Sequence, residues 1–134
     1  MNRFRIAALL ALYGALFAAP ASAGEKNAPV LSARQVKALR CHCCGRGGLD
    51  PRFEHLLLEL QARVGRELRF TSGRRCSCHN AAVGGVVNSR HLRGQAADVA
   101  VPRVCQREFC ALARSLGFRR VLPDARRNYV HLSL

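Results

Sequence analysis

Hydrophobic residues recur at helical spacing in one long segment of the chain. This segment opens with Asp50 and Pro51, a pair typical of a helix N-cap and first turn, and Gly65 follows as a C-cap candidate. The apolar positions between them are Phe53, Leu56, Leu57, Leu60 and Val64. Such a stripe predicts a helix reaching about Arg63, with one face packed in the hydrophobic core.

Shorter helices are predicted from caps and helix-breaking residues. A serine can cap a helix over residues 32–39, and residues 76–83 form a short helix that ends at two glycines. A last helix is predicted over residues 104–116, again followed by glycine. A glycine-rich loop over residues 45–48 separates the first helix from the long one.

Alternating and β-branched segments predict the strands. The first is expected over residues 68–72, and a second, buried strand over residues 96–101. Two closing strands are expected over residues 118–122 and 129–132, joined by a loop that contains Pro123 and Asp124.

One acidic residue interrupts the strand that otherwise reads as buried. Asp98 is the only charged residue in A-A-D-V-A-V, and a buried acid is costly unless it is paired or binds a metal. His91 stands in the turn before this strand, and His131 in the last strand. Neighbouring strands could bring all three to one point. Two imidazoles and a carboxylate hold zinc and leave a position for water, whose pKa zinc lowers to about 7.

Other interpretations of these three residues remain open. A surface histidine beside a helix-capping aspartate is common at the spacing of His91 and Asp98. Asp98 could also orient a histidine rather than bind the metal itself. The sequence therefore predicts a zinc site with His91, Asp98 and His131 as ligands, against these two alternatives.

Four stretches in order resemble the zinc D-Ala-D-Ala carboxypeptidases and murein endopeptidases, the LAS-type metallopeptidases (peptidase M15A-like). The stretches are S-G-R-R-C (72–76), H-N-A-A-V-G-G (79–85), N-S-R-H-L-R-G-Q-A-A-D-V (88–99) and Y-V-H-L (129–132). The resemblance runs from about Cys41 to Leu134. It implies the same three zinc ligands, an α+β fold with a small central antiparallel sheet flanked by helices, and peptidoglycan stem peptides as the substrate class.

The resemblance also implies roles for two polar residues. Arg75 lies in the S-G-x-R turn, where an arginine of the family contacts the substrate or the developing oxyanion, and a fixed guanidinium can do this. The alternative for Arg75 is an ordinary surface arginine. Ser89 could donate a hydrogen bond to the substrate or cap the turn, and the sequence leaves both open. His79 and Asn80 are expected to hold their loop rather than to bind metal.

The general base is where the chain departs from this family. Relatives carry an acid three residues before the last histidine or two residues after it, and these positions hold Asn128 and Ser133 here. The nearest remaining acids are Asp124 and Glu108. We expect Asp124 to serve as the base, because a loop that precedes the last strand can fold over the site.

The N-terminus has the pattern of an export signal. A basic start is followed by an apolar stretch over residues 6–19, which is too short to span a bilayer comfortably. The small residues at 21–23 provide a cleavage site. We expect a signal peptide over residues 1–23 and one exported domain over residues 24–134, located in the periplasm or cell wall. An uncleaved membrane anchor is the alternative.

The chain is strongly basic. It holds 22 Lys and Arg against 8 Asp and Glu, a formal net charge of +14. Such a charge often indicates nucleic acid, but an exported protein meets other polyanions, including peptidoglycan carboxylates and envelope phosphates. We therefore expect anionic cell-envelope polymers as further partners, no nucleic acid, and no membrane after signal cleavage. Solvated surface arginines without a partner are the alternative.

The 7 cysteines predict disulfides, since small exported domains are commonly stapled by them. The odd number leaves at least one unpaired. We expect a bond from the cluster at residues 41–44 to Cys76 or Cys78, which would tie the first helix to the turn before the metal site. A structural zinc site is the alternative, but C-x-C pairs match zinc knuckles poorly.

Three functions are compatible with these patterns. The first is a zinc peptidase that hydrolyses D-amino-acid-containing bonds of peptidoglycan, as a D,D-carboxypeptidase or an endopeptidase. The second is a catalytically impaired wall-binding or metal-binding module of the same fold, which the missing acid near His131 favours. The third is a basic exported binder of anionic polymers, whose binding would depend steeply on salt.

Overall fold

The structure, a computed structural model, describes residues 29–134. The predicted signal peptide at residues 1–23 lies outside this range. Over residues 29–134 no helix combines the length and the apolar character needed to cross a membrane.

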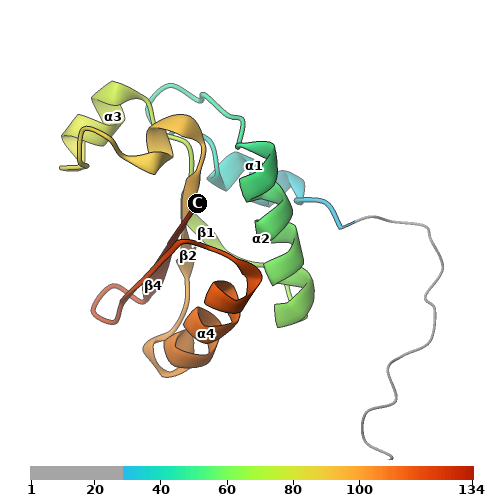
Figure 1. Cartoon of the computed structure of the whole chain (residues 1–134). Helices are drawn as coiled ribbons and strands as arrows, with labels where there is room; N and C mark the ends of the chain where they lie inside the picture. The colour runs from blue at the N-terminus through green and yellow to red at the C-terminus, as the bar shows by residue number, and fades with distance from the viewer. Residues whose placement is uncertain (1–28) are drawn as a thin grey trace, which may run out of the picture.

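A sheet of four antiparallel strands forms the centre of the fold (Figure 1). Its spatial order is β1-β2-β4-β3, so the last two strands in sequence form a hairpin whose second strand pairs with β2. The bounds are Phe70–Ser72 for β1, Ala96–Ala100 for β2, Arg120–Asp124 for β3 and Tyr129–Ser133 for β4. The predicted α+β class with a small antiparallel sheet is confirmed.

Four α-helices and two short 3₁₀ turns complete the described chain. The helices are α1 (Ala33–Ala38), α2 (Pro51–Val64), α3 (Ser77–Ala82) and α4 (Gln106–Leu116). The turns are η1 (Arg90–Arg93) and η2 (Arg103–Cys105). All four helices lie where the sequence predicts them, although the first turn of the last predicted helix is 3₁₀ rather than α.

The apolar stripe of α2 lies in the core, as its spacing predicts. Phe53, Leu57 and Leu60 are fully buried, while Leu56 and Val64 pack at the edge of the same cluster. The aspartate before the helix accepts hydrogen bonds from two backbone N–H groups, and the glycine after it adopts a left-handed conformation. These caps fix where the helix begins and ends.

Alternate strand residues divide the sheet into two faces. On one face, Val99, Val130 and Leu132 join the buried side chains of α2 and α4 in one hydrophobic cluster, and both helices lie on this side of the sheet (Figure 1). Because strand side chains alternate, the same strands present Asp98 and His131 on the opposite face. The sheet therefore separates the core from the face that carries Asp98 and His131, two of the predicted metal ligands.

The boundary of β3 corrects one expectation. Pro123 and Asp124 belong to the strand, paired with Val130 and Tyr129, and do not form a loop. β3 is an edge strand, where the missing N–H of a proline is tolerated. Asp124 is thus held at the end of a strand, and the expectation that a loop would fold it over the site is wrong.

The predicted disulfide staple is also wrong for this structure. All seven cysteines are free thiols. The predicted neighbours do meet, because the Cys43 and Cys76 sulfur atoms lie 3.2 Å apart. A disulfide requires about 2.05 Å between sulfur atoms, so the contact joins two unbonded thiols.

Candidate metal centre

Asp98 and His131 face each other across two paired strands. They are direct partners in the register between β2 and β4, so their side chains project from the same face of the sheet. His131 Nδ1 donates a hydrogen bond to Asp98 Oδ1 over 2.8 Å. The neighbouring strands thus bring these two predicted ligands together.

His91 reaches the same carboxylate from η1. Its ring is buried, and Nδ1 lies 2.7 Å from the carbonyl oxygen of Gly73. A carbonyl only accepts, so Nδ1 carries the proton and Nε2 is left with its lone pair. Nε2 lies 3.6 Å from Asp98 Oδ1. A carbonyl that fixes the tautomer of a histidine in this way is typical of a metal ligand.

The three side chains fit a zinc ion. Their ligand atoms all lie within 4.8 Å of one another, and ligands at 2.0–2.2 Å from a tetrahedral metal are separated by roughly 3.4 Å. The His91 and His131 rings are 5.1 Å apart and tilted by 56°, so both can direct a nitrogen at one point beside Asp98. His91 and Asp98 are buried while His131 is half-exposed, which leaves one side of the site open to the cleft.

Asp98 is ionised at this site. Burial raises the pKa of its carboxyl group, but the hydrogen bond from His131 and the neighbouring His91 ring outweigh burial and hold the pKa well below its usual range. A carboxylate kept ionised in a half-closed site is the form that binds a cation.

Arg75 lies against Asp98 rather than free in the cleft. Its Nη2 donates to Asp98 Oδ2 over 3.1 Å, and Nε and Nη2 both donate to the Ser72 hydroxyl. Asp98 therefore uses Oδ2 for the arginine and Oδ1 for the two histidines. The arginine fixes the carboxylate in the rotamer that faces His91 and His131.

Ser89 lies in the site as a cap. Its hydroxyl oxygen accepts a hydrogen bond from the backbone N–H of His91 over 3.3 Å, at the start of η1. The hydroxyl also borders the cleft. Of the two roles left open by the sequence, this contact gives Ser89 the capping role, and its O–H proton remains for a second partner.

Asp124 borders the same cleft but points its carboxylate into its own turn. Oδ1 accepts hydrogen bonds from the backbone N–H groups of Arg126 and Arg127 over 3.0 and 2.9 Å. Oδ2 lies 3.8 Å from the Arg127 guanidinium. Glu108, the other acid considered, is exposed on α4, on the opposite side of the sheet. The structure brings Asp124 near the metal ligands and leaves Glu108 apart.

A cleft of about 700 Å³ opens over the three ligands. Among the described residues that line it, positive charge is in excess. The basic side chains are Arg75, Arg90, Arg93 and Arg120, and the acids are Asp98 and Asp124. Such a lining favours a substrate that carries carboxylates.

Several of the cleft residues were not predicted from the sequence. Tyr129 and Arg120 both line the cleft, and strand alternation could have identified them. Tyr129 stands two residues before His131, so it shares its face of β4. Arg120 stands two residues before Leu122, the residue paired with His131 across the hairpin.

Gly94 controls the position of His91. Its φ is +70°, and a Cβ there would lie 2.6 Å from the backbone oxygen of Gly48. Gly84 has a similar φ of +68° but open space around it. We expect Gly84→Ala to cost about 1–2 kcal/mol of unfolding free energy from backbone strain alone. Gly94→Ala should cost more and also weaken zinc binding, as urea denaturation and a zinc titration would show; equal effects of both variants would contradict this role.

Arg75 is expected to tune the metal affinity through Asp98. Arg75→Gln removes the charge that holds Oδ2 and should weaken zinc binding by about 10–100-fold, the usual effect of losing a partner of a metal ligand. Arg93→Gln is the matched control, because Arg93 lines the cleft but bonds Gln95 rather than a ligand. Competition with a zinc chelator measures both. Equal affinities in the two variants would show that Arg75 does not position Asp98.

Comparison with known proteins agrees with this geometry. The family model described as peptidase M15 matches residues 34–133, which includes all three predicted metal ligands, Arg75, Ser89 and Asp124. No curated protein matches the chain.

Proposed function

Because the chain belongs to the peptidase M15 family of zinc metallopeptidases, we propose that it hydrolyses D-amino-acid-containing peptide bonds of peptidoglycan. The single observation that carries this proposal is the convergence of His91, Asp98 and His131 at the base of a basic cleft. The reaction is that of a D,D-carboxypeptidase or an endopeptidase acting on stem peptides.

The charge of the cleft supports this substrate class. Stem peptides carry free carboxylates, and the cleft lining presents arginines from three segments of the chain. Arg75 uses Nε and Nη2 within the protein, which leaves its Nη1 donors for a substrate carboxylate or the developing oxyanion. Ser89 retains a hydroxyl proton that can serve the same substrate.

The chain's own residues hold the reacting groups in place. His91, Asp98 and His131 would hold the zinc, which when bound polarises the scissile carbonyl and acidifies the attacking water. Gly73 and Arg75 orient two of these ligands through the contacts described above. Asp124 takes the proton from the attacking water through Oδ2, since Oδ1 is engaged by the turn.

We further propose that the protein acts outside the cytoplasm. The basic and apolar start of the sequence, followed by small residues at 21–23, supports export to the periplasm or cell wall. Peptidoglycan lies in the same place. Anionic polymers of the cell envelope would bind the arginines outside the cleft, because basic residues outnumber acidic ones in the chain.

The test is incubation of the zinc-loaded full chain with purified muropeptides, read by mass spectrometry. Loss of a terminal D-alanine indicates a carboxypeptidase, and separation of cross-linked peptides indicates an endopeptidase. Peptides with L-alanine in place of D-alanine are the matched control and should stay intact. Cleavage of the L-peptides at an equal rate would contradict the D,D-specificity.

A non-catalytic binding module remains the second candidate, because Asn128 and Ser133 occupy the positions where relatives carry an acid. This candidate predicts that the zinc-loaded chain binds muropeptides without cleaving them. The same mass-spectrometric assay, combined with co-sedimentation on peptidoglycan sacculi, separates the two functions.

A further inference from the structure

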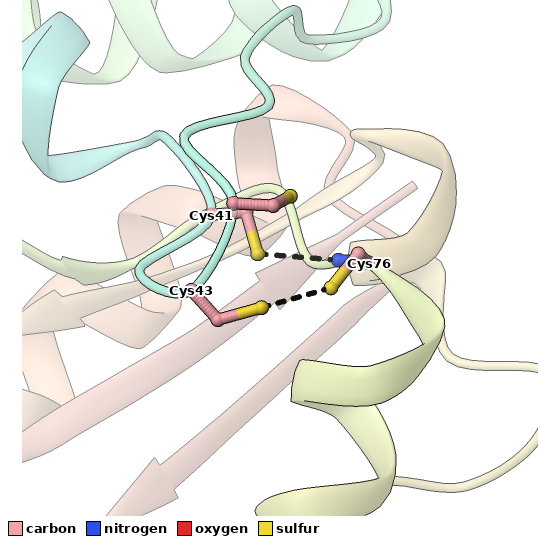
Figure 2. A group of neighbouring side chains, drawn as sticks. Cys41, Cys43 and Cys76 are labelled. Carbon is pink, nitrogen blue, oxygen red and sulfur yellow. Dashed lines mark hydrogen bonds between the residues drawn. The ribbon is translucent and has the colours of Figure 1, made fainter.

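Four cysteines gather at a place that the catalytic cleft does not use. Cys41, Cys43 and Cys44 follow α1, and Cys76 caps the N-terminus of α3. Their sulfur atoms all lie within 4.8 Å of one another. Figure 2 shows Cys41, Cys43 and Cys76 with their sulfur atoms turned toward a common centre. The other three cysteines of the chain are outside this group.

The spacing of these thiols fits a shared ion better than a disulfide. Sulfur ligands at about 2.3 Å from a tetrahedral zinc lie roughly 3.8 Å apart. The Cys43 and Cys76 sulfurs are 3.2 Å apart and the whole set lies within 4.8 Å. A single disulfide between Cys43 and Cys76 would join only two of the four sulfurs and would leave the buried Cys41 sulfur outside the bond.

Backbone contacts around the cluster favour thiolates. The N–H of Cys76 donates to the Cys41 sulfur over 3.3 Å (Figure 2), and the N–H of His79 donates to the Cys76 sulfur over 3.3 Å. N–H donors stabilise the negative charge that a sulfur carries when it binds a metal. Two of the four sulfurs are therefore prepared for the charged form by the fold itself.

The local sequence also provides a zinc-type turn. Cys41 and Cys44 have the C-x-x-C spacing that is typical of zinc sites. This spacing is easily overlooked because Cys43 lies between them and forms a C-x-C pair with Cys41. Gly45 follows with a φ of +69° and donates its N–H to the Cys41 carbonyl over 2.8 Å. This tight turn directs both sulfurs of the pair to one side.

We propose that Cys41, Cys43, Cys44 and Cys76 bind a second zinc ion in a structural, four-thiolate site. Four cysteine ligands leave no open position for water, so the site is closed and has no catalytic step. Soft sulfur donors in tetrahedral arrangement favour zinc over calcium or magnesium. The proposal does not depend on the peptidase activity.

The site would support the catalytic turn. Cys76 directly follows Arg75, the residue that holds Asp98. The same segment is tied to the end of α1, because the Arg74 N–H donates to the Leu39 carbonyl over 2.8 Å. A metal bridge between residues 41–44 and Cys76 would fix the N-terminal end of α3, and with it the backbone of Arg75.

The test counts zinc in variants of the purified full chain. The wild type should hold two zinc ions per chain, and His91→Ala/His131→Ala should hold one. Adding Cys43→Ser/Cys76→Ser to that variant should remove the remaining ion. Cys78→Ser/Cys105→Ser is the matched control, because both residues are exposed cysteines outside the cluster, and it should keep the zinc.

A second measurement does not rely on cysteine variants that could fail to fold. The His91→Ala/His131→Ala protein is reconstituted with Co²⁺, and thiolate ligation should produce a sulfur-to-cobalt charge-transfer band. Absence of this band, together with no zinc in the same protein, would overturn the proposal. An unreduced mass lower by two hydrogens, with a mapped bond between Cys43 and Cys76, would overturn it in favour of a disulfide.

Discussion

Replacing His91, Asp98 or His131 with alanine is expected to remove the zinc of the cleft and abolish peptide hydrolysis. Each residue is one of the three predicted zinc ligands, so its loss should weaken zinc binding by more than the roughly 10–100-fold that follows loss of an outer contact. Metal analysis should show one zinc per chain fewer than the wild type, and muropeptide cleavage should fall to background.

The control for this set is His55→Ala. His55 is an exposed histidine on α2 and is not part of the ligand group, so zinc content and cleavage should be unchanged. If His91→Ala and Asp98→Ala both retain all of their zinc, the metal centre assigned here is wrong. If they lose zinc while cleavage continues, the centre exists but does not perform the reaction.

The sequence predicted that His91, Asp98 and His131 converge, because local patterns determined their positions. A lone acid in a buried strand and a histidine in an alternating strand needed only strand pairing to meet, and β2 pairs with β4 with Asp98 opposite His131. His91 needed a turn that glycine permits, and Gly94 adopts that conformation. Short-range patterns of this kind also predicted α2 and its caps correctly.

The partners of the charged residues could not be predicted in the same way. Arg75 was expected to meet substrate, but its strongest contact is Asp98, a residue 23 positions away. The chain contains many arginines with the same side chain and charge. Only the fold determines which of them contacts the Asp98 carboxylate. The end of β3 was mispredicted for a related reason. Proline usually indicates a loop, and it is compatible with a strand only where that strand lies at the edge of the sheet, which the sequence does not reveal.

For the cysteines, the predicted contact was correct but the predicted disulfide was wrong. The expected link between the first helix and the turn at Cys76 correctly predicted that residues 41–44 approach Cys76, yet the structure holds free thiols there. An oxidising compartment favours disulfides in exported proteins. The compartment does not tell whether two cysteine sulfurs lie together as a pair or four lie together as a cluster. That distinction depends on the positions of Cys41 and Cys44, which only the fold provides.

Asp124→Asn is expected to lower turnover by about 10²–10⁴-fold while zinc stays bound, the usual effect of losing a general base. Asn keeps the Oδ1 acceptor that holds the N–H groups of Arg126 and Arg127, so the turn should persist and only the proton acceptor at Oδ2 is lost. Stem-peptide cleavage rates and metal analysis on the same preparation measure both effects.

Glu108→Gln is the comparison for Asp124→Asn, since Glu108 lies on α4 away from the cleft and its loss should leave the cleavage rate unchanged. Equal rates in both variants and the wild type would show that Asp124 is not the base. If the zinc-loaded wild type itself cleaves no muropeptide, the absence of an acid beside His131 has removed the catalytic step. The protein would then act as a binding module that kept the metal centre and lost the proton acceptor.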